Sequence, residues 1–295
     1  MTPALLIVNP RASGVDSAVV ADVTNVLKRE AELEVVATRD RGHATELVRE
    51  LPAGTERIFA MGGDGLFNEV ANGVGAVLPV GLLAAGASNV LPRALGLPGD
   101  ARTAAERLVA SQTTRQISLG VANGRRFTFC CGLGVDAEIV RAIDARGRAA
   151  GRRASDLTFA WELTRLVASR RFVLRPSMEV VGHGRCSFAI VANGNPYTYA
   201  GRLPVHATPL ARFEAGVDVV APRRLGPAGI AGLAWAVLVR PGRQTRSDTF
   251  VYLHDIDEAL IRCDGPTAVQ VDGEDIGDVG ELTIGVERAA MTVIT

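Results

Sequence analysis

The stretch FAMGGDGLFNEV, residues 59–70, joins an apolar run to a helical-looking segment through a turn of three glycines and one aspartate. Glycine adopts left-handed backbone angles and leaves room for close approach of an anion. The first N–H groups of a helix lack partners within the helix, so this strand–turn–helix unit predicts an anion site at the helix N-terminus. The spacing fits neither GxGxxG nor the Walker pattern, which argues against ordinary dinucleotide binding and against a P-loop.

Asp64 is the charged residue of this turn. A carboxylate beside a bound polyphosphate requires an intervening cation, and Mg²⁺ held by a carboxylate, phosphate oxygens and water meets that requirement. On another interpretation, Asp64 only caps the helix that follows. The spacing by itself leaves both interpretations open.

Around this turn, the first part of the chain alternates apolar runs with segments of helical character. The apolar runs cover residues 4–8, 33–38, 57–61 and 77–83. Helices are expected at about 17–30, after residue 43 and from about residue 66. Strands separated by helices predict a parallel sheet covered on both faces, and therefore an α/β N-terminal domain.

From about residue 118 the pattern changes to short strand-like segments, among them 124–132 and 268–274, with helices near 156–169 and 227–239. Short strands bounded by Gly, Pro and Asp predict a β-sandwich. We therefore expect two domains, residues 1–117 and residues 118–295, and the last strand is allowed to return to the first domain.

Composition excludes several classes of partner. The 295 residues are 47% hydrophobic and carry 32 basic and 32 acidic side chains, so no global charge recruits nucleic acid. Lys28 is the only lysine, which leaves arginine as the cation for binding phosphate. The four cysteines lack zinc or redox spacing, and the N-terminus lacks the features of a signal peptide. We expect a cytoplasmic protein, peripheral at most on the inner face of the membrane.

The segment RAIDARGRAAGRR, residues 141–153, is rich in arginine. It is interpreted first as a solvated connection. The alternative is a basic surface that meets anionic lipid headgroups.

The stretch MGGDGLFNEVANG, residues 61–73, resembles the GGDGT-x-NE-x-x-NG signature of the diacylglycerol kinase catalytic family. That family includes sphingosine kinases and bacterial lipid kinases, and is distantly related to NAD kinases. Six further segments resemble family motifs in the same order: VNPRASG (8–14), TRDRGHA (38–44), GLLAAGASNVLPRALGLP (81–98), GLGVDAEIV (132–140), VANGNPYTYAGRLPVHATPLARFEAGVDVV (191–220) and VQVDGE (269–274). Collinear matches along the chain are far more specific than any single motif.

The resemblance implies an enzyme that transfers the γ-phosphoryl group of ATP, with Mg²⁺, to a lipid hydroxyl in phospholipid biosynthesis. Diacylglycerol or a related lipid is the expected acceptor, and the site is expected in the cleft between the two domains. Asp64 is the expected metal ligand. The residues that the resemblance assigns to the nucleotide site are Asn9, Pro10, Ser13, Gly14, Thr38, Gly62, Gly63, Asp64, Gly65, Asn68, Glu69, Ser88 and Asn89.

The resemblance assigns the proton-accepting base to Asp272 of the DGE motif. Glu274 lies two residues later, on the same face if a strand continues that far, where it would orient or tune the base. On pattern alone, the dipeptide Asp272-Gly273 equally predicts a hairpin turn with exposed acids.

The chain departs from the family pattern at several positions. Leu66 replaces the threonine of GGDGT, Val90 replaces an aspartate, and Ala215 offers no ligand for the structural Mg²⁺ of some bacterial members. These losses leave open a kinase-like module that binds nucleotide or lipid and transfers phosphate weakly. NAD kinase is a second alternative, because it shares the GGDG turn.

The retained set Asp64, Asn68, Glu69, Asp272 and Glu274 favours the enzyme. The expected partners are a lipid substrate and, transiently, a membrane surface, but no nucleic acid. Whether the chain forms a homodimer stays open.

Overall fold

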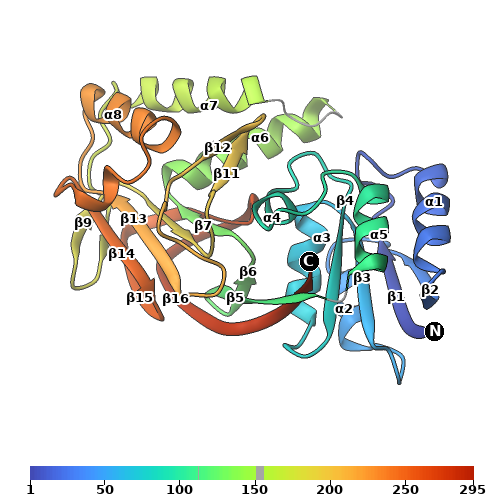
Figure 1. Ribbon diagram of the computed structural model, residues 1–295. Coiled ribbons are helices and arrows are strands. Elements are labelled where there is room, and N and C mark those ends of the chain that lie inside the picture. The colour runs from blue at the N-terminus through green and yellow to red at the C-terminus, as the bar shows by residue number, and fades with distance from the viewer. Residues whose placement is uncertain (112, 151–155) are drawn as a thin grey trace. The chain divides into compact units, whose positions relative to one another are not determined.

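The computed structural model describes residues 1–111, 113–150 and 156–295 (Figure 1). The chain forms two compact units. Unit 1 comprises Met1–Leu119 and Glu287–Thr295, and unit 2 comprises Gly120–Val286. Unit 1 is α/β and unit 2 is rich in β-structure, so the predicted fold class is confirmed.

Unit 1 contains a parallel sheet in the order β2-β1-β3-β4. The end of strand β16 lies beside β4, also parallel, with Thr292 opposite Pro79 and Val293 opposite Val80. The bounds of these strands are β1 Thr2–Val8, β2 Ala31–Ala37, β3 Arg57–Gly62, β4 Pro79–Ala84 and β16 Glu274–Ile294.

Helices cover both faces of this sheet, as the sequence predicts. On one face, α1 and α5 bury alternate strand residues, among them Leu6, Phe59 and Leu83. The neighbouring residues Ile7 and Ile58 point to the other face and are equally buried. There α2 packs on α3, and α3 packs on β3 (Figure 1). The helices are α1 Ser17–Leu27, α2 His43–Arg49, α3 Asp64–Gly73, α4 Val90–Ala94 and α5 Ala101–Ala110.

Unit 2 is built on strands in the order β14-β13-β10-β7-β15-β16, and a hairpin of β8 and β9 pairs with β15. Its core includes Phe127, Leu133, Val191, Val269 and Leu282. The strands are β5 Thr114–Ala122, which leads into unit 2, β6 Arg125–Phe127, β7 Cys130–Leu133, β8 Met178–Val180, β9 Gly184–Cys186, β10 Ala189–Ala192, β11 Thr198–Ala200, β12 Leu203–Val205, β13 Val217–Pro222, β14 Phe250–Ile256 and β15 Glu258–Val271. Strands β15 and β16 are much longer than the short segments that the sequence predicts.

Helices α6 Val135–Ala150, α7 Asp156–Ser169 and α8 Pro227–Leu238 gather on one side of the strands of unit 2 (Figure 1). A short 3-10 helix, η1 Gln244–Arg246, follows α8. The interpretation of residues 141–153 as a connection is wrong for residues 141–150, which continue α6. Residues 151–153 lie outside the described part of the chain.

Candidate active site

The glycine turn lies at the topological switch point of the unit 1 sheet. In the order β2-β1-β3-β4, β1 connects to β2 on one side and β3 connects to β4 on the other, so the connections that follow β1 and β3 run in opposite directions. Open α/β sheets bind ligands at such a point, beyond the carboxyl ends of the strands. The loops that follow β1 and β3 begin at Asn9 and Gly63.

Three loops converge there through backbone hydrogen bonds. The N–H of Asn9 donates to Met61 O at 2.9 Å, and the N–H of Gly14 donates to Ala85 O at 2.9 Å. The N–H of Ala85 in turn donates to Gly62 O at 2.7 Å. The structure therefore brings together residues 9–14, 62–65 and 85–89, which the sequence assigned to one site.

Gly86 is required by the packing of these loops against each other. A Cβ on Gly86 would lie 2.5 Å from the Cα of Gly63. Asn89, at φ 48°, fixes the loop 85–89. Its Oδ1 accepts the N–H of Gly86 at 2.9 Å, and its Nδ2 donates to Gly86 O at 2.8 Å. The side chain of Asn89 thus closes this loop.

Asp64 is the first residue of α3, which begins two residues earlier than predicted. Asp64 is not the N-cap residue that one interpretation expected, because Gly63 occupies the N-cap position of α3. Instead, Oδ1 of Asp64 accepts the N–H of Leu91, in the first turn of α4, at 3.3 Å.

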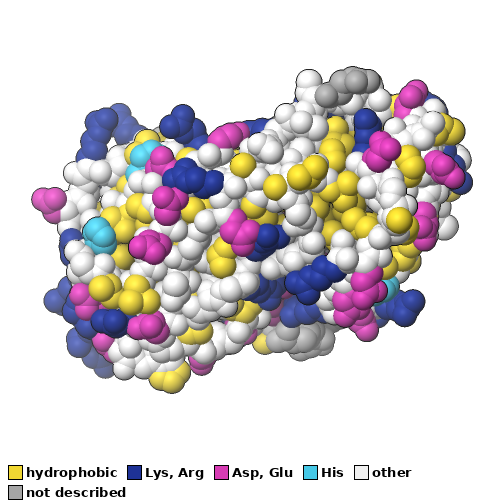
Figure 2. All heavy atoms as spheres, turned by 90° about the horizontal axis from the view of Figure 1, so that it is seen from below, with side chains coloured by type: hydrophobic (Ala, Val, Ile, Leu, Met, Phe, Trp, Pro, Cys, Tyr) yellow, Lys and Arg dark blue, Asp and Glu magenta, His cyan; other side chains and the backbone are white. Residues whose placement is uncertain are grey.

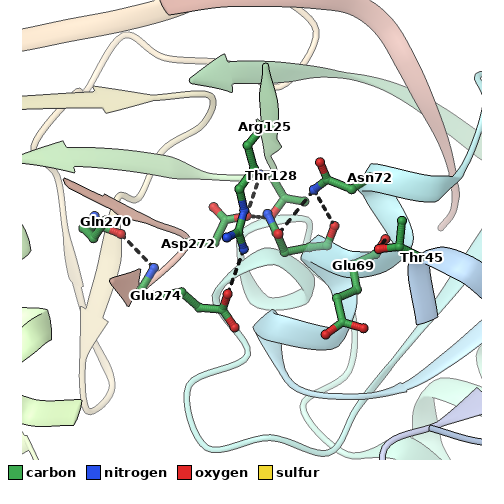
Figure 3. Close-up of polar contacts among 10 residues, drawn as sticks. Thr45, Glu69, Asn72, Arg125, Thr128, Gln270, Asp272 and Glu274 are labelled. Atoms are coloured by element: carbon green, nitrogen blue, oxygen red, sulfur yellow. Dashed lines mark hydrogen bonds and ion pairs between the residues drawn. The ribbon is translucent and has the colours of Figure 1, made fainter. Parts of the chain in front are cut away.

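Asn68 and Glu69 form hydrogen bonds with residues of α3 and α2. Asn68 is buried, and its backbone oxygen accepts Nδ2 of Asn72 at 2.9 Å. Glu69 reaches the start of α2, where its Oε2 accepts the N–H of Ala44 at 3.1 Å. Its backbone oxygen accepts the hydroxyl of Thr45 at 2.7 Å, and Figure 3 shows these two residues next to each other. A carboxylate is stabilised by the N–H groups and the dipole of a helix N-terminus. In this structure Glu69 therefore joins the GHA segment to α3.

The remaining nucleotide-site candidates surround the same loops. The N–H of Thr38 donates to Val8 O at 2.8 Å, which places Thr38 beside the end of β1. Ser88 is exposed on the loop that Asn89 closes. Pro10 lines a groove of about 440 Å³ along the β1–α1 loop, whose other lining residues are Val8, Val15, Asp16, Ser17, Val20, Ala21, Val35 and Ala37.

Among the described residues, no group of three or more His, Cys, Asp or Glu is arranged to hold a metal ion. The donor set at the turn is the single carboxylate of Asp64, and Mg²⁺ commonly binds through one or two carboxylates plus the phosphates of a substrate. The residues present therefore fit a metal that arrives with a nucleotide and do not form a separate cage.

In unit 2, Asp272 and Gly273 form the turn between β15 and β16, at φ 49° and 80°. Val271 lies opposite Glu274 across the ladder, so the dipeptide makes a two-residue hairpin of the type that favours Asp-Gly. The hairpin prediction is right, but the acid is not exposed, because Asp272 is only 5% accessible. Glu274 begins the next strand, so the condition for its sharing a face with Asp272 is not met.

The Asp272 carboxylate is held by the segment between β6 and β7. Oδ2 accepts the N–H of Thr128 at 2.7 Å and its hydroxyl at 2.8 Å. Oδ1 accepts the N–H groups of Phe129 and Cys130, each at 3.0 Å. These bonds explain why the segment 124–132, predicted as one strand, is split into β6 and β7: its backbone turns toward the carboxylate (Figure 3).

A buried polar chain supports the same turn. Gln270 Oε1 accepts the N–H of Gly273 at 2.8 Å, and its Nε2 donates to Asp136 at 2.8 Å. The hydroxyl of Tyr197 donates to the other oxygen of Asp136 at 2.5 Å. Burial raises the pKa of the Asp136 carboxyl above its usual value, although these two hydrogen bonds lower it. Sequence reasoning gave no role to Tyr197 or Gln270, and it noted Asp136 only within a motif.

Glu274 pairs with Arg125, Nη2 to Oε2 at 2.7 Å, and both side chains are partly exposed (Figure 3). Arg125 belongs to β6, so this ion pair joins the second strand of the hairpin to the segment that binds Asp272. Glu274 is thus tied to an arginine that the sequence did not single out.

The surface agrees with the balanced composition. Figure 2 shows basic and acidic side chains interspersed on the face that it presents, without a broad area of one sign. None of the described helices combines the length and apolar character required to cross a membrane.

Residues 3–122 match the family model of the diacylglycerol kinase catalytic domain. Over 101 residues the chain is 38% identical to a diacylglycerol kinase of Staphylococcus haemolyticus, a match that covers 32% of this chain and 30% of that protein. Over 107 residues it is 34% identical to a diacylglycerol kinase of Bacillus subtilis, which covers 35% of each. These matches span about a third of the length of the curated relatives.

Two solved structures resemble the whole chain. A diacylglycerol kinase from Bacillus anthracis superposes with a TM-score of 0.72 at 18% identity, covering 99% of this chain and 96% of that one. An NAD kinase from Archaeoglobus fulgidus, solved in complex with ATP, gives 0.50 at 14% identity, covering 100% and 94%. At these identities the likeness shows a shared fold. The match of residues 3–122 to this family model confirms, for that part of the chain, the resemblance to the diacylglycerol kinase catalytic family drawn from its motifs.

Proposed function

We propose that this protein is a lipid kinase that transfers the γ-phosphoryl group of ATP to the hydroxyl of diacylglycerol or a related lipid. The observation that carries the proposal is the convergence of residues 9–14, 62–65 and 85–89 at the switch point of the unit 1 sheet. Phosphoryl transfer depends mainly on positioning and on charge neutralisation, which loops of this kind provide.

The nucleotide is proposed to bind to unit 1. The groove along the β1–α1 loop is lined mainly by small apolar side chains, such as Val15 and Val35, which suits the flat face of a purine ring. The N–H groups at the start of α3 then face the phosphates. When bound, Mg²⁺ would neutralise phosphate charge, and Asp64 would hold it at the turn.

The acceptor hydroxyl is proposed to give its proton to Asp272. All the hydrogen bonds described above reach this carboxylate from fixed backbone groups except one, which comes from the hydroxyl of Thr128. A hydroxyl rotates, whereas the backbone donors are held by the turn. We infer that the Thr128 hydroxyl turns away when Asp272 accepts the proton.

The same geometry favours a second candidate, a module that binds nucleotide or lipid and transfers phosphate weakly. A carboxylate offers about four acceptor positions, and the donors from Thr128, Phe129 and Cys130 already occupy positions on both oxygens of Asp272. A base engaged in this way is a poor proton acceptor unless one donor leaves.

One experiment separates these functions. Purified protein is incubated with [γ-³²P]ATP, Mg²⁺, a total bacterial lipid extract and NAD, and the products are resolved by chromatography. A labelled lipid supports the lipid kinase and identifies the acceptor. Labelled NADP in place of a labelled lipid would make the protein an NAD kinase. ATP binding by calorimetry without any labelled product would support the binding module, and the Asp272→Asn variant controls for contaminating kinases.

A further inference from the structure

Helix α8 carries apolar side chains on both of its faces. Ile230 and Leu233 pack inward against the cluster beneath the helices of unit 2. On the opposite side Ala231 is exposed, Trp235 is 54% accessible and Leu238 is 46% accessible. These last three residues are spaced by four and three positions, so they share one face. An all-round apolar helix is typical of a buried environment, yet half of α8 is left uncovered within unit 2.

The exposed apolar area extends beyond the helix. Val239, directly after α8, is 52% accessible, and Leu203 on β12 is 65% accessible. The N–H of His206, which follows β12, donates to Val237 O in α8 at 2.8 Å, so the two elements lie side by side. We call Leu203, Trp235, Leu238 and Val239 the α8 surface.

Arginines bracket the α8 surface in the sequence. No charged residue occurs between positions 225 and 239, and no acidic residue between 219 and 247. The exposed basic residues on either side of the helix are Arg223, Arg224, Arg240, Arg243 and Arg246. Along the sequence, the apolar helix is therefore bordered at both ends by arginines, with no acid between Asp218 and Asp248.

This charge pattern identifies the occupant of the surface. A bilayer that contains anionic phospholipid offers an apolar interior bordered by phosphates, and it complements an apolar helix bordered by arginines. Tryptophan prefers the depth at which headgroups meet acyl chains. The 12 residues of α8 span about 18 Å at 1.5 Å per residue, well below the roughly 30 Å of a hydrocarbon core, so the helix would lie in the membrane plane.

We propose that the α8 surface docks on a bilayer containing anionic phospholipid, with Trp235 and Leu238 inserted and the bracketing arginines on the lipid phosphates. In assigning a purpose to this docking, the inference rests on the proposed function, because a kinase for membrane lipids meets its acceptor in the bilayer. The docking itself requires neither ATP nor turnover.

The test uses the full chain carrying Trp161→Phe, which leaves Trp235 as its only tryptophan. Vesicles of phosphatidylcholine alone are compared with vesicles containing 30% phosphatidylglycerol. We expect a blue shift of Trp235 emission with the anionic vesicles, quenching by bromine placed on the acyl chains, and release in high salt, which screens the arginines.

Variants assign the contact to residues. Trp235→Ser/Leu238→Ser should weaken vesicle binding of the wild-type chain, followed by sedimentation, by about tenfold or more. Arg240→Gln/Arg243→Gln should weaken it by about 25-fold, at roughly fivefold per basic residue. The matched controls lie in unit 1: Val77→Ser for an exposed apolar side chain, and Arg29→Gln/Arg102→Gln for exposed arginines. Circular dichroism verifies that every variant is folded.

Unchanged Trp235 emission with anionic vesicles, or equal binding by the apolar variant and its control, would overturn the proposal. A dimer in light scattering that dissociates on Trp235→Ser/Leu238→Ser would also overturn it, because a second copy would then cover α8. Vesicle binding without any lipid phosphorylation would leave the docking intact and defeat the proposed function alone. Phosphorylation of lipid dispersed in detergent, without vesicle binding, would defeat the docking alone.

Discussion

The backbone N–H of Thr128 and the carboxylate of Asp272 lie 2.7 Å apart, although the two residues are separated by 144 positions in the sequence. The hydroxyl of Thr128 binds the same oxygen at 2.8 Å. The hairpin that follows β15 is thereby anchored to the segment between β6 and β7. Asp272, the residue proposed as the catalytic base, therefore also joins two segments of unit 2.

Asp272→Asn should abolish phosphoryl transfer and leave ATP affinity, measured by calorimetry, unchanged. The amide presents an NH₂ group to backbone donors in either orientation, so the free energy of unfolding should fall by about 1–3 kcal/mol. Thr128→Val is the matched control, because it removes one hydrogen bond and retains the carboxylate. If Asp272→Asn turned over at the rate of the wild type, Asp272 would lose the role of base.

Asp64→Ala should weaken the binding of Mg·ATP by about tenfold or more, because the proposed metal loses its protein ligand. Asp64→Asn is the sharper variant, since its side-chain oxygen still accepts the N–H of Leu91 while the charge is lost. Calorimetry of both variants with Mg²⁺ and with EDTA separates the two contributions. Equal affinity of Asp64→Asn and wild type in Mg²⁺ would remove Asp64 from the metal site.

Leu66→Thr tests a departure from the family pattern. If the missing hydroxyl matters, the sequence predicts that this variant holds or raises activity, because threonine restores the hydroxyl of the family motif. Leu66 is buried, however, and its Cδ2 would lie 2.7 Å from a Cβ placed on Gly62, so it packs closely over the turn. We expect the variant to lose about 2–3 kcal/mol of stability in urea denaturation. A stability equal to that of wild type would contradict this packing argument.

Glu69→Gln should reduce stability by about 0.5–1 kcal/mol, because an amide oxygen is a weaker partner than a carboxylate for the N–H of Ala44 at the start of α2. The loss should decline in high salt, which screens a charge–dipole interaction. Exposed Glu46→Gln, in the first turn of α2, controls for loss of an acid near the same helix end. A drop in Mg·ATP affinity greater than the drop in stability would instead place Glu69 at the phosphates.

Asp136→Asn should alter the dependence of stability on pH. Burial raises the pKa of Asp136 in the folded protein, so the unfolded chain ionises first as pH rises. The contribution of this group is therefore fully present below its unfolded pKa of about 3.9 and declines as pH rises through the folded pKa. As pH rises from about 3.9 through the folded pKa, the free energy of unfolding of the wild type should fall relative to that of Asp136→Asn. Urea titrations from pH 4 to pH 8 test this, with exposed Asp22→Asn as the control.

The sequence predicted the elements whose residues have a regular pattern. Apolar runs located β1, β3 and β4, because these strands are buried on both faces, and an apolar run and helical periodicity located β2 and the helices α1 to α3. Helix α5 has no long apolar run to mark it, although Asp100 provides a cap signal: its side chain accepts the N–H of Thr103 at 2.8 Å. Helix α4 has only five residues, and it follows a left-handed Asn89 that no periodicity reveals.

The candidate site was predictable only where a local motif carries it. The turn 62–65 is recognisable in the sequence from its glycines. The contact of Gly63 with Gly86 is not, because it depends on β3 and β4 being neighbours in the sheet. The donors to Asp272 have no local signature, because two of the three N–H groups belong to ordinary residues, Phe129 and Cys130. Leu66 is a core residue because the fold buries it over the turn, and the sequence alone does not show that burial.

The parallel pairing of Thr292 and Val293 with β4 has a consequence for biosynthesis. As the chain leaves the ribosome, β1 to β4 emerge early, but the edge of β4 stays unpaired until Thr292 and Val293 have been synthesised. An unpaired edge is a template for association with other chains. Folding of unit 1 should thus be slow and late, and nascent chains released before residue 292 should be prone to aggregate.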